Sequence, residues 1–384
     1  MQPIYLDHNA TTPTRPEVIE AMSRCLAEGY ANPASPHQPG QRARRVLEDA
    51  RRQIAEILGA NLDDRQPDRL IFVGSGTEAN NLAVLGIARA SGERPGQIVI
   101  SAIEHASVIG PAEHLLERGW KLDTVGVSDG GVVCLEQLAP LLGPQTRLVS
   151  IMLGNHETGV LQPVAEAAAM CRDAGVPLHT DAVAVAGKRP LDFRRLGVAA
   201  LSIAAHKFQG PLGIAALLVR QGIAVQPLLF GGHQQEALRP GTEAVALAVG
   251  MATALDLWQR EQDAHLRHLT ALRDRLEAGL KAACPKVVVH GQGAPRLPQT
   301  TNIAFPGLDG QVLLLALDMS GVACSVGSAC ASGSSELSPT LRAMNVPAGL
   351  LGSSLRFSVG ASTTETQIDE AVRRIVSVCR ELHG

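Results

Sequence analysis

The chain has 384 residues, of which 45% are hydrophobic and 18% are charged, and its formal net charge is −3. A chain of this length is too long to fold around one small hydrophobic core, so we predict one large and one smaller domain. There is no basic excess to attract nucleic acid or an anionic membrane, and no apolar run approaches the ~20 residues that span a bilayer. The N-terminal stretch lacks the charged and apolar regions of a signal peptide. We therefore expect a cytoplasmic globular protein that binds neither nucleic acid nor membrane.

The seven cysteines are spread along the chain without a CxxC pair or a zinc-binding spacing. This distribution is typical of free thiols in a reducing compartment, most of them buried as small hydrophobic side chains. We expect no metal site.

Short apolar segments alternate with helical ones up to about residue 220. Candidate strands cover residues 69–75, 97–102, 146–153, 176–181, 199–205 and 213–219. Helical segments such as 78–90 and 164–175 lie between them. Strands that are apolar on both faces and separated by helices indicate a mostly parallel sheet with helices on each side. Ligands of such sheets bind where the strands end.

The pattern changes from about residue 251. A long amphipathic helix is predicted over 251–283, followed by short strands at 287–291 and 300–305. A final helix is predicted over 364–382, after a threonine-rich capping signal. These elements are expected to form the second domain.

The stretch "FVGSGTEANN" (72–81) ends a strand in glycines and opens a helix. Backbone N–H groups at such a helix start, together with the Thr77 hydroxyl, can hold a phosphate. A purely structural turn has the same composition. The stretch matches neither the Walker loop nor the dinucleotide fingerprint.

Two other strand ends carry Asp181, in "HTDA", and Lys207, in "AHKF". Alone, the carboxylate could cap a helix and the lysine could be an ordinary surface charge. Together with a phosphate site they meet the needs of pyridoxal phosphate: an amine for the Schiff base and a carboxylate that keeps the pyridine nitrogen protonated. His105 ends a further strand and could stack on the ring.

The chain resembles the cysteine desulfurases and selenocysteine lyases, in the class V aminotransferase group of fold-type I pyridoxal phosphate enzymes. The resemblance covers nearly the whole chain, and its motifs are "YLDHNATTP", "GTEANN", "ETGVLQPV", "RPGTE", "SVGSACASG" and "SLRFSVG". It implies an α/β fold with a mostly parallel seven-stranded sheet in a large cofactor-binding domain, residues 15–255. It also implies a smaller α+β domain, residues 1–14 and 256–384.

The resemblance also implies the site residues. Lys207, His105 and Cys330 would be catalytic, while Arg356 and Asn155 would bind the substrate, Arg356 through its α-carboxylate. The implied cofactor contacts are Gly76, Thr77, His105, His156, Asp181, Ala184, Ala204, His206, Lys207 and Thr242. Thr242 would reach the phosphate of the neighbouring subunit, which implies a homodimer.

Cys330 lies in a Gly- and Ser-rich segment that predicts a loop. By resemblance it takes the sulfur of L-cysteine as a persulfide, releases L-alanine, and passes the sulfur to an acceptor such as an iron–sulfur scaffold protein. A buried structural cysteine is the alternative from composition alone. Cys324, six positions earlier, is expected to be a packing residue.

Three positions depart from the family pattern: His156 replaces an asparagine, Ala184 a glutamine and Ala204 a serine. Each lost hydrogen bond weakens cofactor binding by about 0.5–1.5 kcal/mol. Some selenocysteine lyases also lack that serine, so a selenocysteine lyase is one alternative. A non-catalytic dimeric relative is another, although the retained Lys207, Cys330 and Arg356 argue against it.

Overall fold

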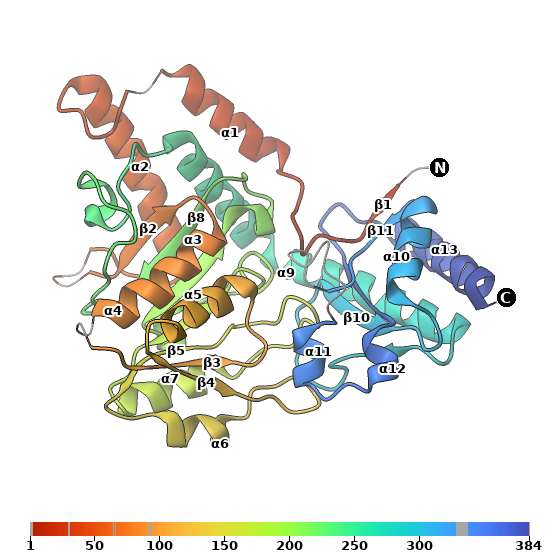
Figure 1. Ribbon diagram of the computed structural model, residues 1–384. Helices are drawn as coiled ribbons and strands as arrows, with labels where there is room; N and C mark the ends of the chain where they lie inside the picture. The colour runs from red at the N-terminus through yellow and green to blue at the C-terminus, as the bar shows by residue number, and fades with distance from the viewer. Residues whose placement is uncertain are drawn as a thin grey trace.

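The computed structural model describes residues 3–29, 31–63, 65, 67–90, 92, 94–327 and 337–383. A seven-stranded sheet forms its larger part (Figure 1). The strands, in spatial order, are β2 (Arg69–Val73), β8 (Ala215–Val219), β7 (Ala200–Ala204), β6 (Leu178–Asp181), β5 (Thr146–Ser150), β3 (Gln97–Ser101) and β4 (Lys121–Val125). Only β8 runs antiparallel to its neighbours in this sheet. The predicted mostly parallel sheet is confirmed.

Edge strand β4 is absent from the sequence prediction. Its residues, Lys-Leu-Asp-Thr-Val, are mostly exposed or half-buried and end in one buried valine. An edge strand needs one apolar face only, so it lacks the continuous apolar run by which the inner strands were predicted.

The two faces of the sheet pack against different helices. Leu70 and Phe72 of β2 belong to the core shared with α2 (Gln38–Ile57), α7 (Val164–Asp173) and α9 (Val245–Ala283). Ile71 and Val73 belong to the opposite core. That core is shared with α5 (Ala106–Leu116) and with the helical segment α3 (Gly76–Asn81), π-helical η1 (Leu82–Ile87) and α4 (Ala88–Ala90). Alternate side chains of a strand point to opposite faces of the sheet, so strands that are apolar throughout have buried side chains on both faces.

The smaller part has its own core and sheets. Antiparallel strands β12 (Ser354–Ser358), β10 (Thr300–Ala304) and β9 (Val288–Val289) form one sheet. N-terminal β1 (Ile4–Tyr5) pairs in parallel with β11 (Val322–Ala323). Helices α10 (Gly310–Met319) and α13 (Glu365–His383) pack on these strands. The strands predicted at 287–291 and 300–305 and the final helix are thus confirmed.

The long helix α9 runs from the larger sheet towards the smaller part (Figure 1). The predicted domain boundary at residue 255 lies inside this helix, and the division at that point stays a prediction.

The remaining helices are α1 (Pro16–Ala27), α6 (Leu135–Leu138), α8 (Phe193–Leu196), α11 (Pro339–Ala343) and α12 (Ala348–Leu351). Short 3-10 turns are η2 (Ala139–Leu141), η3 (Ala205–Phe208) and η4 (Gln234–Ala237). Within the described ranges, no helix combines the length and apolar character needed to cross a membrane.

Candidate active site

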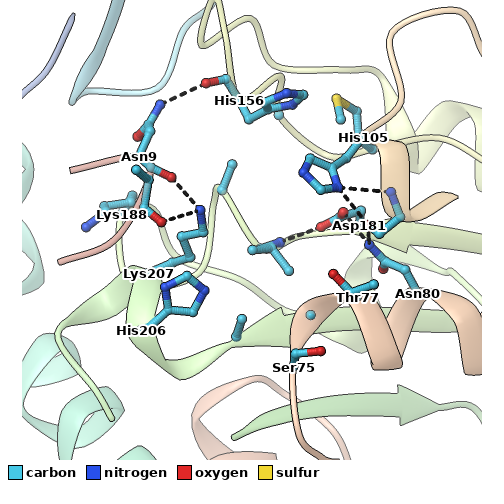
Figure 2. A pocket seen from close by; sticks show the side chains of 18 of the residues that line it. Asn9, Ser75, Thr77, Asn80, His105, His156, Asp181, Lys188, His206 and Lys207 are labelled. Atoms are coloured by element: carbon cyan, nitrogen blue, oxygen red, sulfur yellow. Dashed lines mark hydrogen bonds between the residues drawn. The ribbon is translucent and has the colours of Figure 1, made fainter. Parts of the chain in front are cut away.

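A cavity lies beyond the carboxyl ends of β6 and β7, closed on one side by the N-terminal residues 8–10 (Figure 2). Its volume is about 250 Å³. The predicted site residues that line it are Gly76, Thr77, His105, His156, Asp181, Ala184, Ala204, His206, Lys207 and Arg356. The structure therefore brings together most of the set predicted from separate strand ends.

The start of α3 forms one wall of the cavity. Ser75 caps this helix, its hydroxyl accepting a 3.1 Å hydrogen bond from the backbone N–H of Glu78. A Cβ added to Gly76 would lie 3.1 Å from Val183 Cγ2 and 3.4 Å from Ala204 Cβ. The glycine therefore lets the backbone approach its neighbours closely, with the first N–H groups of the helix available for an anion. Ala204 lies directly against this helix start.

Asp181, at the end of β6, is buried with both carboxylate oxygens bonded. Its Oδ2 accepts a 2.6 Å hydrogen bond from Asn80 Nδ2, and its Oδ1 accepts one of 2.8 Å from the Val183 backbone N–H. Asn80 in turn donates to Ser107 Oγ at 2.8 Å. The carboxylate is therefore held in one orientation by the helix that also forms the anion site.

Lys207 lies in η3, immediately after β7, and reaches the N-terminal segment. Its Nζ donates hydrogen bonds to the backbone oxygens of Asn9 and, at 3.0 Å, Ala10 (Figure 2). The Thr12 hydroxyl donates to the His206 backbone oxygen at 2.6 Å. The "HNATTP" stretch thus forms a wall of the cavity around the lysine, although it lies almost 200 residues away in sequence.

Two histidines face each other in the cavity. The rings of His105 and His156 meet edge-to-face, with centroids 5.1 Å apart. His105 Nδ1 accepts a 3.1 Å hydrogen bond from the Ser107 backbone N–H, which caps α5. Both ring nitrogens of His156 are buried, and neither has a hydrogen-bond partner within the part of the chain that the structure describes. Two unsatisfied nitrogens that line a cavity are available to a ligand.

Burial keeps the cavity histidines neutral. Desolvation lowers the pKa of His105, and it lowers that of His156 well below its usual range, helped by the nearby His105, Arg356 and Lys207. Burial, and then the charge of Lys207, lowers the pKa of His206 to about 4. The positive charge of the cavity therefore comes from its lysines and its arginine.

Arg356 enters the cavity from β12 of the smaller part. Its side chain is almost fully buried, and its Nη2 forms a 2.7 Å ion pair with Asp7 Oδ1. Its Nη1 donates to the backbone oxygen of His156 at 3.3 Å. Its Nε is buried without a partner among the described residues. The guanidinium is oriented by these contacts and retains a free donor.

Three predicted residues are not among those lining the cavity. Cys330 lies outside the described residues. Thr242 is exposed on the surface. Asn155 is fully buried, its Oδ1 accepting from the backbone N–H groups of Glu157 and Thr158 at 3.0 and 2.9 Å. The Asn155 amide thus closes its own turn and is not directed into the cavity.

Other lining residues are absent from the sequence prediction: His8, Asn9, Ser75, Asn80 and Lys188. Four of these, His8, Asn9, Ser75 and Asn80, stand inside or next to recognised motifs, which was the available signal. Lys188 is a single charge after the apolar run "AVAVAG". Its burial could be seen only in the fold.

The arrangement defines what the cavity can hold. An anionic group fits at the start of α3, a protonated ring nitrogen fits at Asp181, and a carbonyl carbon fits within reach of the Lys207 amine. A carboxylate fits at Arg356. The donors and charges therefore suit a phosphorylated aldehyde cofactor together with an amino-acid substrate.

The aminotransferase class-V family model matches residues 4–371. The chain is 38% identical to cysteine desulfurase IscS of Dictyoglomus turgidum, over 99% of this chain and 96% of that protein. It is 37% identical to cysteine desulfurase NifS of Azotobacter vinelandii, over 100% and 94%. The solved structure of a NifS-like protein from Rickettsia africae superposes with a TM-score of 0.89 at 32% identity, covering 98% of this chain and 99% of that one. The chain therefore belongs to the aminotransferase class-V family, alongside the cysteine desulfurases, as its motifs predicted.

Proposed function

We propose that the protein is a pyridoxal phosphate-dependent cysteine desulfurase. The observation that carries the proposal is the convergence of Lys207, Asp181 and the start of α3 on one cavity. Relatives named cysteine desulfurase align along the whole chain and support the same activity. The reaction converts L-cysteine and an enzyme thiol into L-alanine and an enzyme persulfide.

Pyridoxal phosphate, when bound, supplies an electron sink for the carbanion at the α-carbon of an amino acid. In this chain the backbone of Gly76 and Thr77 would hold its phosphate, and Asp181 would hold its ring nitrogen protonated. Lys207 would anchor it, and the His105 ring would stack on it. Each of these residues already lines the cavity.

The substrate would be oriented by charge. Arg356 binds the α-carboxylate through its guanidinium, whose orientation is set by Asp7 and by the His156 backbone oxygen. The Lys207 amine, released from its anchoring role, accepts the proton from the α-carbon and later returns one to the product. Because His105 is held neutral and its Nδ1 accepts from the Ser107 backbone N–H, its ring proton is on Nε2, where it can be donated.

Sulfur transfer would use Cys330. Its thiolate attacks the substrate sulfur, the bond between that sulfur and the β-carbon breaks, and the carbon keeps the electron pair and is protonated. The product persulfide then passes its outer sulfur to an acceptor protein, for example an iron–sulfur scaffold. Cys324 is unsuited to this role because burial strongly raises the pKa of its thiol.

We also propose a homodimer in which Thr242 completes the partner's phosphate site. Its exposure on the monomer, outside the cavity of its own chain, is compatible with this role. Mixing inactive Lys207→Ala chains with Thr242→Ala chains should restore activity in mixed dimers, because one of the two sites then carries neither substitution. A fully active monomer in solution would exclude the shared site.

Selenocysteine lyase is the second candidate, favoured by Ala204 at the end of β7, whose side chain lies against the start of α3. A non-catalytic dimeric relative is the third, favoured by the three departures from the family pattern, at His156, Ala184 and Ala204. Both predict outcomes different from those of a desulfurase when L-cysteine is supplied.

The test is direct. The purified chain should take up pyridoxal phosphate with a yellow Schiff-base absorbance, and borohydride should fix the cofactor on Lys207, as peptide mass spectrometry would show. L-cysteine should then yield L-alanine. A chain that takes up no cofactor would be the non-catalytic relative, and one that turns over only L-selenocysteine would be the lyase.

A further inference from the structure

Glu78 places a carboxylate in the first turn of α3. Its Oε2 accepts a 2.6 Å hydrogen bond from the backbone N–H of Gly74, while its own backbone N–H donates to the Ser75 hydroxyl at 3.1 Å. A Cβ added to Gly74 would lie 2.9 Å from Glu78 Oε2, so the glycine leaves the space that the carboxylate occupies. A carboxylate at this position stabilises the helix, because it satisfies a backbone N–H group and meets the positive end of the helix dipole.

The same carboxylate is a disadvantage for an anion site. Ser75, Gly76 and Thr77, which directly precede Glu78 in the chain, line the cavity where a phosphate is proposed to bind (Figure 2). The Glu78 carboxylate has the same sign of charge as a phosphate and repels it. The start of α3 therefore holds a phosphate better when the charge of Glu78 is neutralised.

Arg239 supplies a neutralising charge. Its Nε donates to Glu78 Oε1 at 2.8 Å, and its Nη2 lies 3.5 Å from Glu78 Oε2, so the guanidinium contacts both carboxylate oxygens. The side chains of Arg239 and Glu78 are only 30% and 26% exposed. Among the residues that the structure describes, no other ion pair reaches Glu78. Partial burial limits screening by solvent, so the start of α3 should respond to the loss of either partner.

The backbone on both sides of Arg239 is attached to the elements around the turn between β2 and α3. Four residues before it, the side-chain oxygen of buried Gln235 accepts 2.9 Å hydrogen bonds from the Phe72 backbone N–H and from Arg51 Nη1. Four residues after it, the Glu243 carboxylate accepts a hydrogen bond from Gln235 Nε2. These contacts hold the guanidinium beside the turn.

We propose that Arg239 is a positioning residue of the phosphate site, acting through Glu78, whose negative charge it cancels. Neither residue lines the cavity of this chain, so Arg239 acts on the site without lining it. Glu78 can then cap the helix backbone without repelling an anion at the first N–H groups. The inference rests on the proposed function, because it takes the ligand of this helix start to be the phosphate of pyridoxal phosphate.

The test compares two ligands of the cofactor-free, full-length chain. One is pyridoxal phosphate, and the other is deoxypyridoxal, which has the same ring and aldehyde but a methyl group in place of the phosphate arm. Both dissociation constants are measured from the Schiff-base absorbance during titration. Arg239→Gln should raise the constant for pyridoxal phosphate roughly tenfold, the effect of one uncancelled charge near a dianion, and change that for deoxypyridoxal less than about twofold. High salt should reduce this difference between the two ligands.

Removal of the carboxylate as well should restore binding. In the double variant Arg239→Gln/Glu78→Gln, the amide oxygen can still accept from Gly74, but no charge remains. The dissociation constant for pyridoxal phosphate should therefore return to within about twofold of that of the unsubstituted chain. Arg275→Gln is the matched control, because Arg275 pairs with Asp369 at 2.6 Å, joining α9 to α13, and should affect neither constant. Thermal melting checks folding, and Arg239→Met replaces Arg239→Gln if that variant unfolds.

Three results would overturn the role of Arg239 alone. Equal weakening of both ligands in Arg239→Gln, or a double variant that binds pyridoxal phosphate no better than Arg239→Gln, would indicate packing and not charge. Unchanged binding of both ligands would show that the ion pair does not act on the site. An unsubstituted chain that takes up neither ligand would contradict the proposed function, and this role with it.

Discussion

Asn80 donates a 2.6 Å hydrogen bond from Nδ2 to Oδ2 of Asp181, joining helix α3 to the end of β6. Both groups are buried, so the bond to the carboxylate is worth more than one at the surface. The helix whose start is proposed to hold a phosphate thereby also orients the carboxylate that is proposed to hold a ring nitrogen. One side-chain amide thus connects the two proposed binding points.

Asn80→Ala should therefore weaken cofactor binding. Loss of a hydrogen bond to a charged group costs about 1.5–3 kcal/mol, which is about a ten- to hundredfold increase in the dissociation constant for pyridoxal phosphate. The constant can be measured from the Schiff-base absorbance during titration. Asn81→Ala is the control, because the Asn81 amide donates to the Thr77 backbone oxygen and not to Asp181. Equal losses in both variants would contradict a specific role for Asn80.

Ala204→Ser should have the opposite effect. The Cβ of residue 204 lies against Gly76, so a hydroxyl there is within reach of the proposed phosphate site. One added neutral hydrogen bond should lower the dissociation constant about two- to tenfold. Ala205→Ser is the control, since Ala205 is equally buried but its side chain lies against Gly210, away from the cofactor site. A serine at 204 that leaves affinity unchanged would show that the phosphate is held elsewhere.

We expect Cys330, and not Cys324, to be the cysteine that receives sulfur from the substrate. The unsubstituted protein supplied with L-cysteine should gain one sulfur atom on the Cys330 peptide by mass spectrometry. Cys330→Ala should abolish alanine formation from L-cysteine but retain substantial turnover of L-selenocysteine, because the C–Se bond breaks more easily. Cys324→Ala should still form the persulfide. If the added mass appears on Cys324, the assignment of the nucleophile is wrong.

Buried His179 should make the protein sensitive to acid. Its Nδ1 and Nε2 each form a 2.9 Å hydrogen bond, to Ser150 Oγ and Ser202 Oγ, across three strands of the sheet. Burial lowers its pKa from 6.5 to about 4. Below about pH 6.5 the unfolded chain binds a proton that the folded chain does not, so stability is full above that pH and is lost as pH falls towards about 4.

The size of this effect is up to about 3 kcal/mol for the single histidine. Urea unfolding of the unsubstituted chain and of His179→Gln, compared from about pH 7 to about pH 4, should show a stability difference that shrinks on acidification. His233→Gln, on the exposed surface, is the control. A difference that is independent of pH would mean that His179 is not held neutral in the fold.

The inner strands and the long helices were predictable because burial on both faces leaves a strong local pattern. Each inner strand is a short, largely buried segment, and charged residues stand at or just after its end, as at Asp181 and Lys207. Edge strand β4 escaped prediction because half-exposed residues leave no such pattern. The parallel pairing of β5, β6 and β7 then places polar strand ends at one edge of the sheet.

By itself, the sequence determined which chemical groups the protein can bring to a site, since residue types and strand ends can be read locally. Only the tertiary structure decided which of them meet. The N-terminal segment contacts Lys207, Asn80 orients Asp181, and Lys188 is buried at the same cavity. The structure also turned the Asn155 amide inward, to its own turn. Such relationships depend on contacts between residues far apart in the chain, and burial, which sets their charge and hydrogen bonding, is a property of the assembled fold.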